Sequence, residues 1–318
     1  MTNAIHIITS CTDRKRADAG EPVRIRDVRA QSIKTRAKRW WEKLGTVSVR
    51  VPARELYVGA HWSIANELPD VARDKGMKSR LWVASAGYGF VPADKELSSY
   101  SATFATRQAD AVAPKLSGSE ARDAHRAWWS ELAKYGRSRR EPRTIRKLAS
   151  LNPKALLLVV ASPDYVGAME DDLVQARDEL ADPDRLIIVS SDQAGRFPEL
   201  EANWVPTDAR LVDRVGGSMI SLNAAVARDL LKRTAPQNLI PDRLRARYLK
   251  LAKESPDMPS YDDRKTMTDA DVKSLIGKLT KANPKLSRTG ALRELRSSGH
   301  KCEQSRFKRL WEEARGGS

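Results

Sequence analysis

The sequence is poor in the residues that crosslink a chain or ligate a metal. Its 318 residues include only two cysteines, Cys11 and Cys302, and four histidines. So few thiols exclude a disulfide framework and fit a reducing compartment, so we expect a cytoplasmic protein. The histidines are scattered and the cysteines isolated, which excludes the usual zinc-ligand spacings, and we expect no metal.

Long apolar runs and nucleotide-binding loops are missing as well. No apolar run approaches the ~18 residues of a membrane-spanning helix, and the N-terminus lacks the basic-then-apolar pattern of a signal peptide. No Walker loop or dinucleotide fingerprint occurs, because Gly87-Tyr88-Gly89 is too short to form one. We therefore expect a soluble protein with no membrane partner and no organic cofactor, and the sequence indicates no obligate protein partner.

Acidic residues are scarce relative to basic ones. The chain has 57 lysines and arginines against 41 aspartates and glutamates, a formal net charge of +16 and a pI near 9.9. Such an excess predicts a polyanionic partner, nucleic acid before membrane. Basic residues gather in residues 24–43 and 137–147, which favours contact with phosphates over the alternative of a generally basic, solvated surface.

Short apolar runs alternate with helical patterns over most of the chain. This alternation predicts an α/β fold with a central, mostly parallel sheet and flanking helices. We assign residues 1–240 to this domain and residues 241–267 to a linker. The expected strands cover 4–9, 80–86, 155–161 and 185–190, and the expected helices cover 53–68, 119–135, 169–180 and 222–233.

Three short helical patterns follow the expected linker. They predict a basic, three-helix module of the helix-turn-helix type over residues 268–318. We expect Arg293, Arg306 and Arg309 to contact DNA from this module. The alternative is a basic helical cap that only packs on the main domain.

Three aspartates follow predicted strands. Asp94 lies beyond the run 82–91, Asp164 follows 155–161, and Asp192 follows 185–190. Ligands of open α/β sheets bind at the carboxyl ends of the strands, so we expect all three carboxylates to face one cleft. Capping of a helix N-terminus is the alternative role for each of them.

Three segments, in this order along the chain, resemble one known pattern. It is a Cys with a nearby Lys in residues 10–15, Ala-Arg-x-Leu-Tyr in 53–57, and Ser-Ala-x-Tyr-Gly in 85–89 with an acid and Tyr100 downstream. This pattern is similar to the YaaA-like superfamily of DNA-associated proteins, over roughly residues 4–200. Where relatives often have Pro-Tyr-Asp, this chain has Ser99-Tyr100-Ser101, which leaves Asp94 as the main acid of that loop.

One branch of that superfamily is similar to antiviral DNA glycosylases, which remove glucosylated hydroxymethylcytosine from phage genomes. The resemblance therefore implies a DNA glycosylase that excises a modified base from phage DNA. Two alternatives stay open, namely a base-exchanging transglycosylase on nucleic acid and a non-catalytic DNA-binding protein.

Cleavage of an N-glycosidic bond leaves an oxocarbenium-like sugar, which a carboxylate near C1′ stabilises while water is oriented. We expect Asp94 first, and then Asp164 and Asp192, to supply this carboxylate. The target nucleotide must also leave the duplex and stack in a pocket. Candidate base-binding residues are Ser10, Cys11, Tyr57, Ser85, Tyr88, Tyr100 and Tyr165, and candidate DNA-binding residues outside the C-terminal module are Arg14, Lys15, Arg39, Arg139, Arg140 and Arg196.

Several of these candidates have a second interpretation. Lys15 is flanked by Arg14 and Arg16, which favours phosphate binding, although a desolvated lysine would instead attack C1′ as an amine. Cys11 is either a nucleophile or a small packing residue at a strand end. Each tyrosine is either a stacking group or an ordinary core aromatic.

Overall fold

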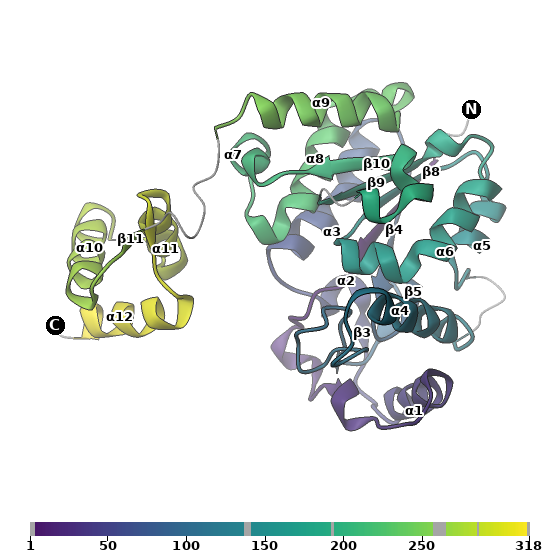
Figure 1. Cartoon of the computed structure of the whole chain (residues 1–318), viewed down its shortest axis with the longest axis horizontal. Helices are drawn as coiled ribbons and strands as arrows, with labels where there is room; N and C mark the ends of the chain where they lie inside the picture. The colour runs from purple at the N-terminus through teal and green to yellow at the C-terminus, as the bar shows by residue number, and fades with distance from the viewer. Residues whose placement is uncertain (1–3, 137–140, 192–193, 257–264, 285, 317–318) are drawn as a thin grey trace. The chain divides into compact units, whose positions relative to one another are not determined.

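The computed structural model describes residues 4–136, 141–191, 194–256, 265–284 and 286–316 (Figure 1). Asp192, Arg139 and Arg140 lie outside these ranges. The chain forms two compact units, Met1–Ser255 and Pro256–Ser318, which are described separately below. None of the helices in the described ranges is long and apolar enough to cross a membrane.

The first unit is built on a six-stranded sheet with the order β10-β9-β8-β1-β4-β5. All neighbours are parallel except β5, which is antiparallel to β4. This confirms the predicted α/β fold. The strands are β1 (Ala4–Ser10), β4 (Lys78–Ser85), β5 (Gly89–Pro92), β8 (Leu156–Val160), β9 (Leu186–Ser191) and β10 (Trp204–Thr207).

Helices cover both faces of this sheet. Helices α3 and α8 pack on each other, and both contact β-strands of the sheet, whereas α6 contacts β9 and packs on α4 and α5. Two short pairs, β2–β7 and β3–β6, add strands outside the main sheet. The helices of this unit are α1 (Ile33–Gly45), α2 (Ala53–Leu56), α3 (Ala60–Asp74), α4 (Gly118–Leu132), α5 (Ile145–Leu151), α6 (Pro163–Glu179), α7 (Val212–Val215), α8 (Leu222–Arg233) and α9 (Pro241–Lys253), and the short strands are β2 (Val23–Arg24), β3 (Val51–Pro52), β6 (Glu96–Leu97) and β7 (Tyr100–Ser101).

Residues 241–253, which the sequence analysis assigned to a linker, form helix α9 of the first unit. Pro241 occupies the start of the helix, where its missing N–H costs nothing. Leu244, Tyr248 and Ala252 follow at helical spacing and are buried. Pro241 therefore marks the start of a helix and not of an extended segment.

The described residues of the second unit form three helices and one short strand pair. Helices α10 (Asp269–Ala282), α11 (Arg288–Ser297) and α12 (Gln304–Gly316) are accompanied by β11 (Lys265–Thr266) and β12 (His300–Lys301). Their apolar faces form a separate small core, whose fully buried members include Val272, Leu295 and Leu310. The sequence analysis correctly predicted C-terminal helices here.

Candidate functional site

The strand order reverses between β1 and β8. From β1 the chain continues through α3 to β4 on one side, and from β8 it continues through α6 to β9 on the other side. Because such crossovers are right-handed, α3 and α6 lie on opposite faces and the loops that follow β1 and β8 diverge. A crevice at such a topological switch point is where open α/β sheets bind ligands.

A side-chain hydrogen bond spans this switch point. The Sγ atom of Cys11, directly after β1, lies 3.1 Å from the Oη atom of Tyr165, in the first turn of α6. Asp164 precedes Tyr165 in the same turn. The topology thus brings together two of the sequence segments that were separately predicted to carry the site.

A second polar group lies at the end of β4. The hydroxyl of Tyr100 is 2.7 Å from the Ser85 Oγ atom and 2.9 Å from the Tyr57 hydroxyl. Burial raises the pKa of both tyrosines well above the usual value, so they are neutral. Ser85 Oγ also accepts hydrogen bonds from the backbone N–H groups of Gly87 and Tyr88. We call Tyr57, Ser85 and Tyr100 the hydroxyl network.

All seven predicted base-binding residues are buried. Each is at most 8% exposed, so they face protein more than solvent, and we call these seven residues the floor of the candidate site. The Tyr88 ring packs edge-on against the Tyr100 ring at 5.4 Å between ring centres, but its hydroxyl is outside the hydroxyl network and accepts from the backbone N–H of Ser98 at 3.0 Å. The exposed residues around this floor include Asp13, Arg14, Asp164 and Arg196.

The ammonium group of Lys15 contacts the ring of Tyr100, a member of the hydroxyl network. Its Nζ atom lies 4.3 Å from the centre of the Tyr100 ring and donates hydrogen bonds to the backbone oxygens of Thr12 and Asp13. Burial lowers the pKa of Lys15, which Cys11 and Asp13 oppose. Two carbonyl acceptors and an aromatic face stabilise the ammonium form. These contacts favour a structural cation over an amine nucleophile.

Asp164 lies at the carboxyl end of the parallel strands, as expected. Ser162 occupies the N-cap position of α6, so Asp164 is a first-turn residue and its alternative role as the capping residue does not apply. Although Asp164 is exposed, neighbouring protein atoms desolvate its carboxyl group and raise its pKa, which Arg196 opposes. The positive end of the helix dipole also favours an anion at this place.

Asp94 is not part of this group, and the expectation that it faces the same cleft is wrong. Strand β5 runs antiparallel to β4, with Ser85 paired to Gly89 and Trp82 paired to Pro92. The chain has therefore returned toward the amino ends of the parallel strands when it reaches Asp94. There the carboxylate is 67% exposed and lies 3.7 Å from Arg80.

The turn between β4 and β5 is held by residues that the sequence analysis had not assigned to the site. The indole of Trp128 donates to the Ala86 carbonyl, and that of Trp40 donates to the Gly87 carbonyl. The Arg143 guanidinium donates to the carbonyls of Tyr88 and Phe90. Both tryptophans belong to Trp-Trp pairs, Trp40-Trp41 and Trp128-Trp129, which were a signal in the sequence because a buried indole N–H needs an acceptor.

The basic run at 137–147 is thus in part structural, and the same holds for 24–43. Arg36 donates to the backbone oxygens of Val28, Val112 and Ile25. By contrast, Arg14, Arg39 and Arg196 are exposed, as DNA contact requires. Arg39 also donates one hydrogen bond to the Arg29 carbonyl.

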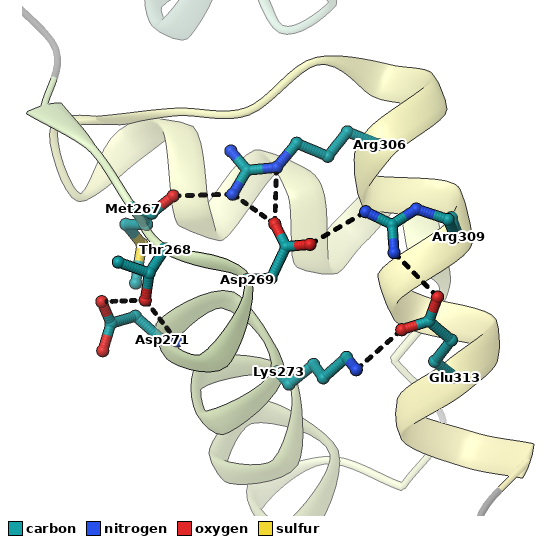
Figure 2. Close-up of polar contacts among 8 residues, drawn as sticks. All are labelled: Met267, Thr268, Asp269, Asp271, Lys273, Arg306, Arg309 and Glu313. Atoms are coloured by element: carbon teal, nitrogen blue, oxygen red, sulfur yellow. Dashed lines mark hydrogen bonds and ion pairs between the residues drawn. The ribbon is translucent and has the colours of Figure 1, made fainter.

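In the C-terminal unit, two of the three predicted DNA-binding arginines are tied to an acid. Figure 2 shows Arg306 and Arg309 on α12 converging on Asp269 at the start of α10, with contacts of 2.5 and 2.9 Å. Arg309 also pairs with Glu313 at 2.8 Å. These contacts hold α10 against α12 and engage both guanidinium groups, although the Arg309 side chain is 55% exposed, so DNA contact by this pair stays a prediction. Arg293 is exposed and makes no hydrogen bond or ion pair within the described part of the chain.

No group of three or more His, Cys, Asp or Glu residues in the described ranges could hold a metal ion. Comparisons with known proteins add no family, because neither a scan against protein-family models nor searches of curated proteins and of solved structures found a match. The resemblance to the YaaA-like superfamily therefore stays a prediction, and the function has to be inferred from the chain's own residues.

Proposed function

We propose that this protein is a DNA glycosylase that excises a modified base, glucosylated hydroxymethylcytosine, from phage DNA in antiviral defence. The observation that carries the proposal is the Cys11–Tyr165 bond across the switch point, with Asp164 beside it. It joins residues 10–15, the first of the segments that resemble such enzymes, to the start of α6 at the edge where open α/β sheets bind ligands. The net charge of +16 supports a polyanionic substrate.

In this proposal Asp164 replaces Asp94 as the principal carboxylate. An oxocarbenium-like sugar held over the floor of the site would be stabilised by the Asp164 anion, which would also orient the attacking water. Arg14 and Arg196 are exposed at the same edge and would hold phosphates on either side of the target nucleotide. The hydroxyl network and Lys15 would keep the floor rigid beneath the extruded base.

An exposed apolar turn supports extrusion of the nucleotide. Ile220 is 82% exposed and Met219 is 58% exposed, both on the short turn η7 (Met219–Ser221). Asn223, three residues further on, donates to the Ala161 carbonyl at the end of β8, so this turn belongs to the same edge as Asp164. Apolar side chains that enter a base stack fill the space that a flipped nucleotide leaves.

The burial of the floor favours one second candidate, a non-catalytic DNA-binding protein. Tyr57 and Tyr100 are each 1% exposed and bond to one another, so neither hydroxyl is free for a base edge in this conformation. Such a protein would use the same charge and the same edge but release no base.

The test is incubation of the whole protein with glucosylated phage DNA and with the same DNA lacking the modification. Alkaline cleavage would count abasic sites, and mass analysis would identify released bases. We expect free modified base and abasic sites from the glucosylated DNA alone. A swapped base without abasic sites would indicate a transglycosylase, and DNA binding without any release would leave the non-catalytic candidate.

A further inference from the structure

Half of the residues that line two neighbouring pockets on the first unit are basic. A pocket of about 310 Å³ lies between α7 and α8 and is lined by Arg214, Val215, Arg228, Asp229, Lys232 and Arg233. A second pocket of about 260 Å³ lies between the end of α8 and α9 and is lined by Arg233, Thr234, Ala235, Asn238, Arg243, Leu244 and Arg247. Arg233 lines both, so the pockets adjoin at this side chain. We call them the twin pockets.

The spacing of residues on α8 creates this arrangement. Arg228 and Lys232 are four residues apart and so lie on one helix face, and Asp229 and Arg233 lie on the next. Helix α9 contributes Arg243 and Arg247 with the same spacing. None of these residues belongs to the two basic runs that the sequence analysis singled out.

Asp229 orients two of the guanidinium groups. Its carboxylate accepts from the Tyr248 hydroxyl at 2.8 Å and from Arg233 Nε at 2.7 Å, and it lies 3.6 Å from Arg247. The Asp229 side chain is 11% exposed, whereas that of Arg233 is 66% exposed. The buried Asp229 carboxylate thus fixes the Nε side of the Arg233 guanidinium group. The other N–H groups of Arg233 face solvent.

The charge of the twin pockets exceeds what the local acids neutralise. Six basic side chains line them, against Asp229 within and Glu67, which pairs with Arg228. The planar guanidinium fork matches phosphate oxygens bidentately, and a fork that is already oriented loses less side-chain entropy on binding. Two adjoining cationic pockets suit a ligand with repeated phosphates better than one with a single phosphate.

We propose that the twin pockets bind successive phosphates of one DNA strand, with Asp229 as the residue that positions Arg233 and Arg247. The proposal rests on the proposed function only in taking DNA as the ligand. It concerns binding and not base release, so the two can fail separately.

The first experiment measures binding of the whole protein to an unmodified 30-bp duplex over a range of salt concentrations. We expect Arg233→Ala to weaken binding about tenfold and to lower the slope of log K against log salt by about 1. Arg107→Ala is the matched control, because Arg107 is exposed, lies between β7 and α4 outside both pockets, and carries the same charge. We expect it to change affinity less than twofold. Equal losses in the two variants would overturn the proposal.

Asp229→Asn separates positioning from charge. If only net charge mattered, removal of a carboxylate would tighten binding to a polyanion. We expect the opposite, a loss of about threefold to tenfold, because Arg233 and Arg247 lose their anchor. In an Arg233→Ala background the same change should cost less, since one of the positioned groups is gone. Tighter binding by Asp229→Asn would overturn the positioning role, and thermal unfolding of each variant checks that it is folded.

Discussion

An aspartate shortly after a buried strand occurs at both ends of the main sheet, but the surroundings of the two aspartates differ. Asp164 and Asp94 each follow a buried strand by a few residues. Asp164 lies in the first turn of a helix, beside a side-chain bond across the switch point, and desolvation raises its pKa. Asp94 lies at the opposite end, well exposed, with Arg80 as its neighbour. Strand direction, not the local motif, decides which acid reaches the ligand-binding edge.

Removing each carboxylate in turn tests whether Asp164 and Asp94 differ in function as they do in position. We expect Asp164→Asn to slow base release on the order of 10³-fold, because a positioned charge at the developing cation is lost. Asp94→Asn should stay within about twofold, since it removes only an exposed ion pair. Single-turnover release from glucosylated phage DNA measures both. A larger loss from Asp94→Asn would reverse the assignment.

The tight turn that reverses the chain after β4, and so separates Asp94 from Asp164, can be tested by substitution of Gly87. A Cβ atom on Gly87 would lie 2.5 Å from two carbon atoms of the Tyr100 ring, so Gly87→Ala must displace that ring and with it the hydroxyl network. We expect a loss of about 3 kcal/mol in the free energy of unfolding. Gly45→Ala is the control, because nothing lies within 4 Å of a Cβ there. Urea unfolding followed by circular dichroism compares the two, and a similar stability would show that the ring moves freely.

Four of the five parallel strands were predicted from the sequence, because runs such as 156–160 are apolar at every position and buried on both faces. The fifth, β10 (Trp204–Thr207), is short, contains Pro206 and was not predicted. The sequence did not predict that the chain reverses its direction at 85–89. Gly87 and Gly89 indicate a turn, but they do not show that Gly89, with φ of +70°, begins a strand antiparallel to β4. The position of Asp94 depended on that reversal.

The roles of charged residues were predicted less accurately from the sequence than the buried strands were, for a physical reason. A basic run looks the same in the sequence whether its arginines face DNA or donate to buried carbonyls, as Arg143 does. The partner that decides is often distant, such as Asp269 for Arg306 across 37 positions. Hydrophobic periodicity is a local signal, whereas the pairing of charges is settled only by the tertiary fold.

A buried histidine on the carboxyl-end side makes stability depend on pH. His61 lies 2.9 Å from the Thr9 hydroxyl, and burial lowers its pKa to about 4 from the usual value of 6.5. Between these values the unfolded chain binds more protons than the folded one, so stability falls as the pH falls through this window. From pH 7 to pH 5 we expect a loss of about 2 kcal/mol from this residue.

His61→Gln tests this assignment, because the amide can retain the bond to Thr9 but does not titrate. The variant should show a flatter dependence of unfolding free energy on pH between 7 and 5, measured by urea unfolding. An unchanged slope would mean that other groups dominate and that His61 is not held neutral by burial.

The smallest expected effect concerns the exposed turn near the carboxyl ends. If Ile220 fills the space left by a flipped nucleotide, Ile220→Ser should slow base release from duplex DNA about tenfold, a cost of ~1.4 kcal/mol. Release from the same DNA made single-stranded should be nearly unchanged, because no base stack has to be filled. Leu249→Ser is the control, since Leu249 is 43% exposed on α9, away from this turn. Equal losses on both DNA forms would mean that Ile220 acts in the floor of the site and not in the base stack. The functional difference between the two ends of the sheet would then depend on Asp164 alone.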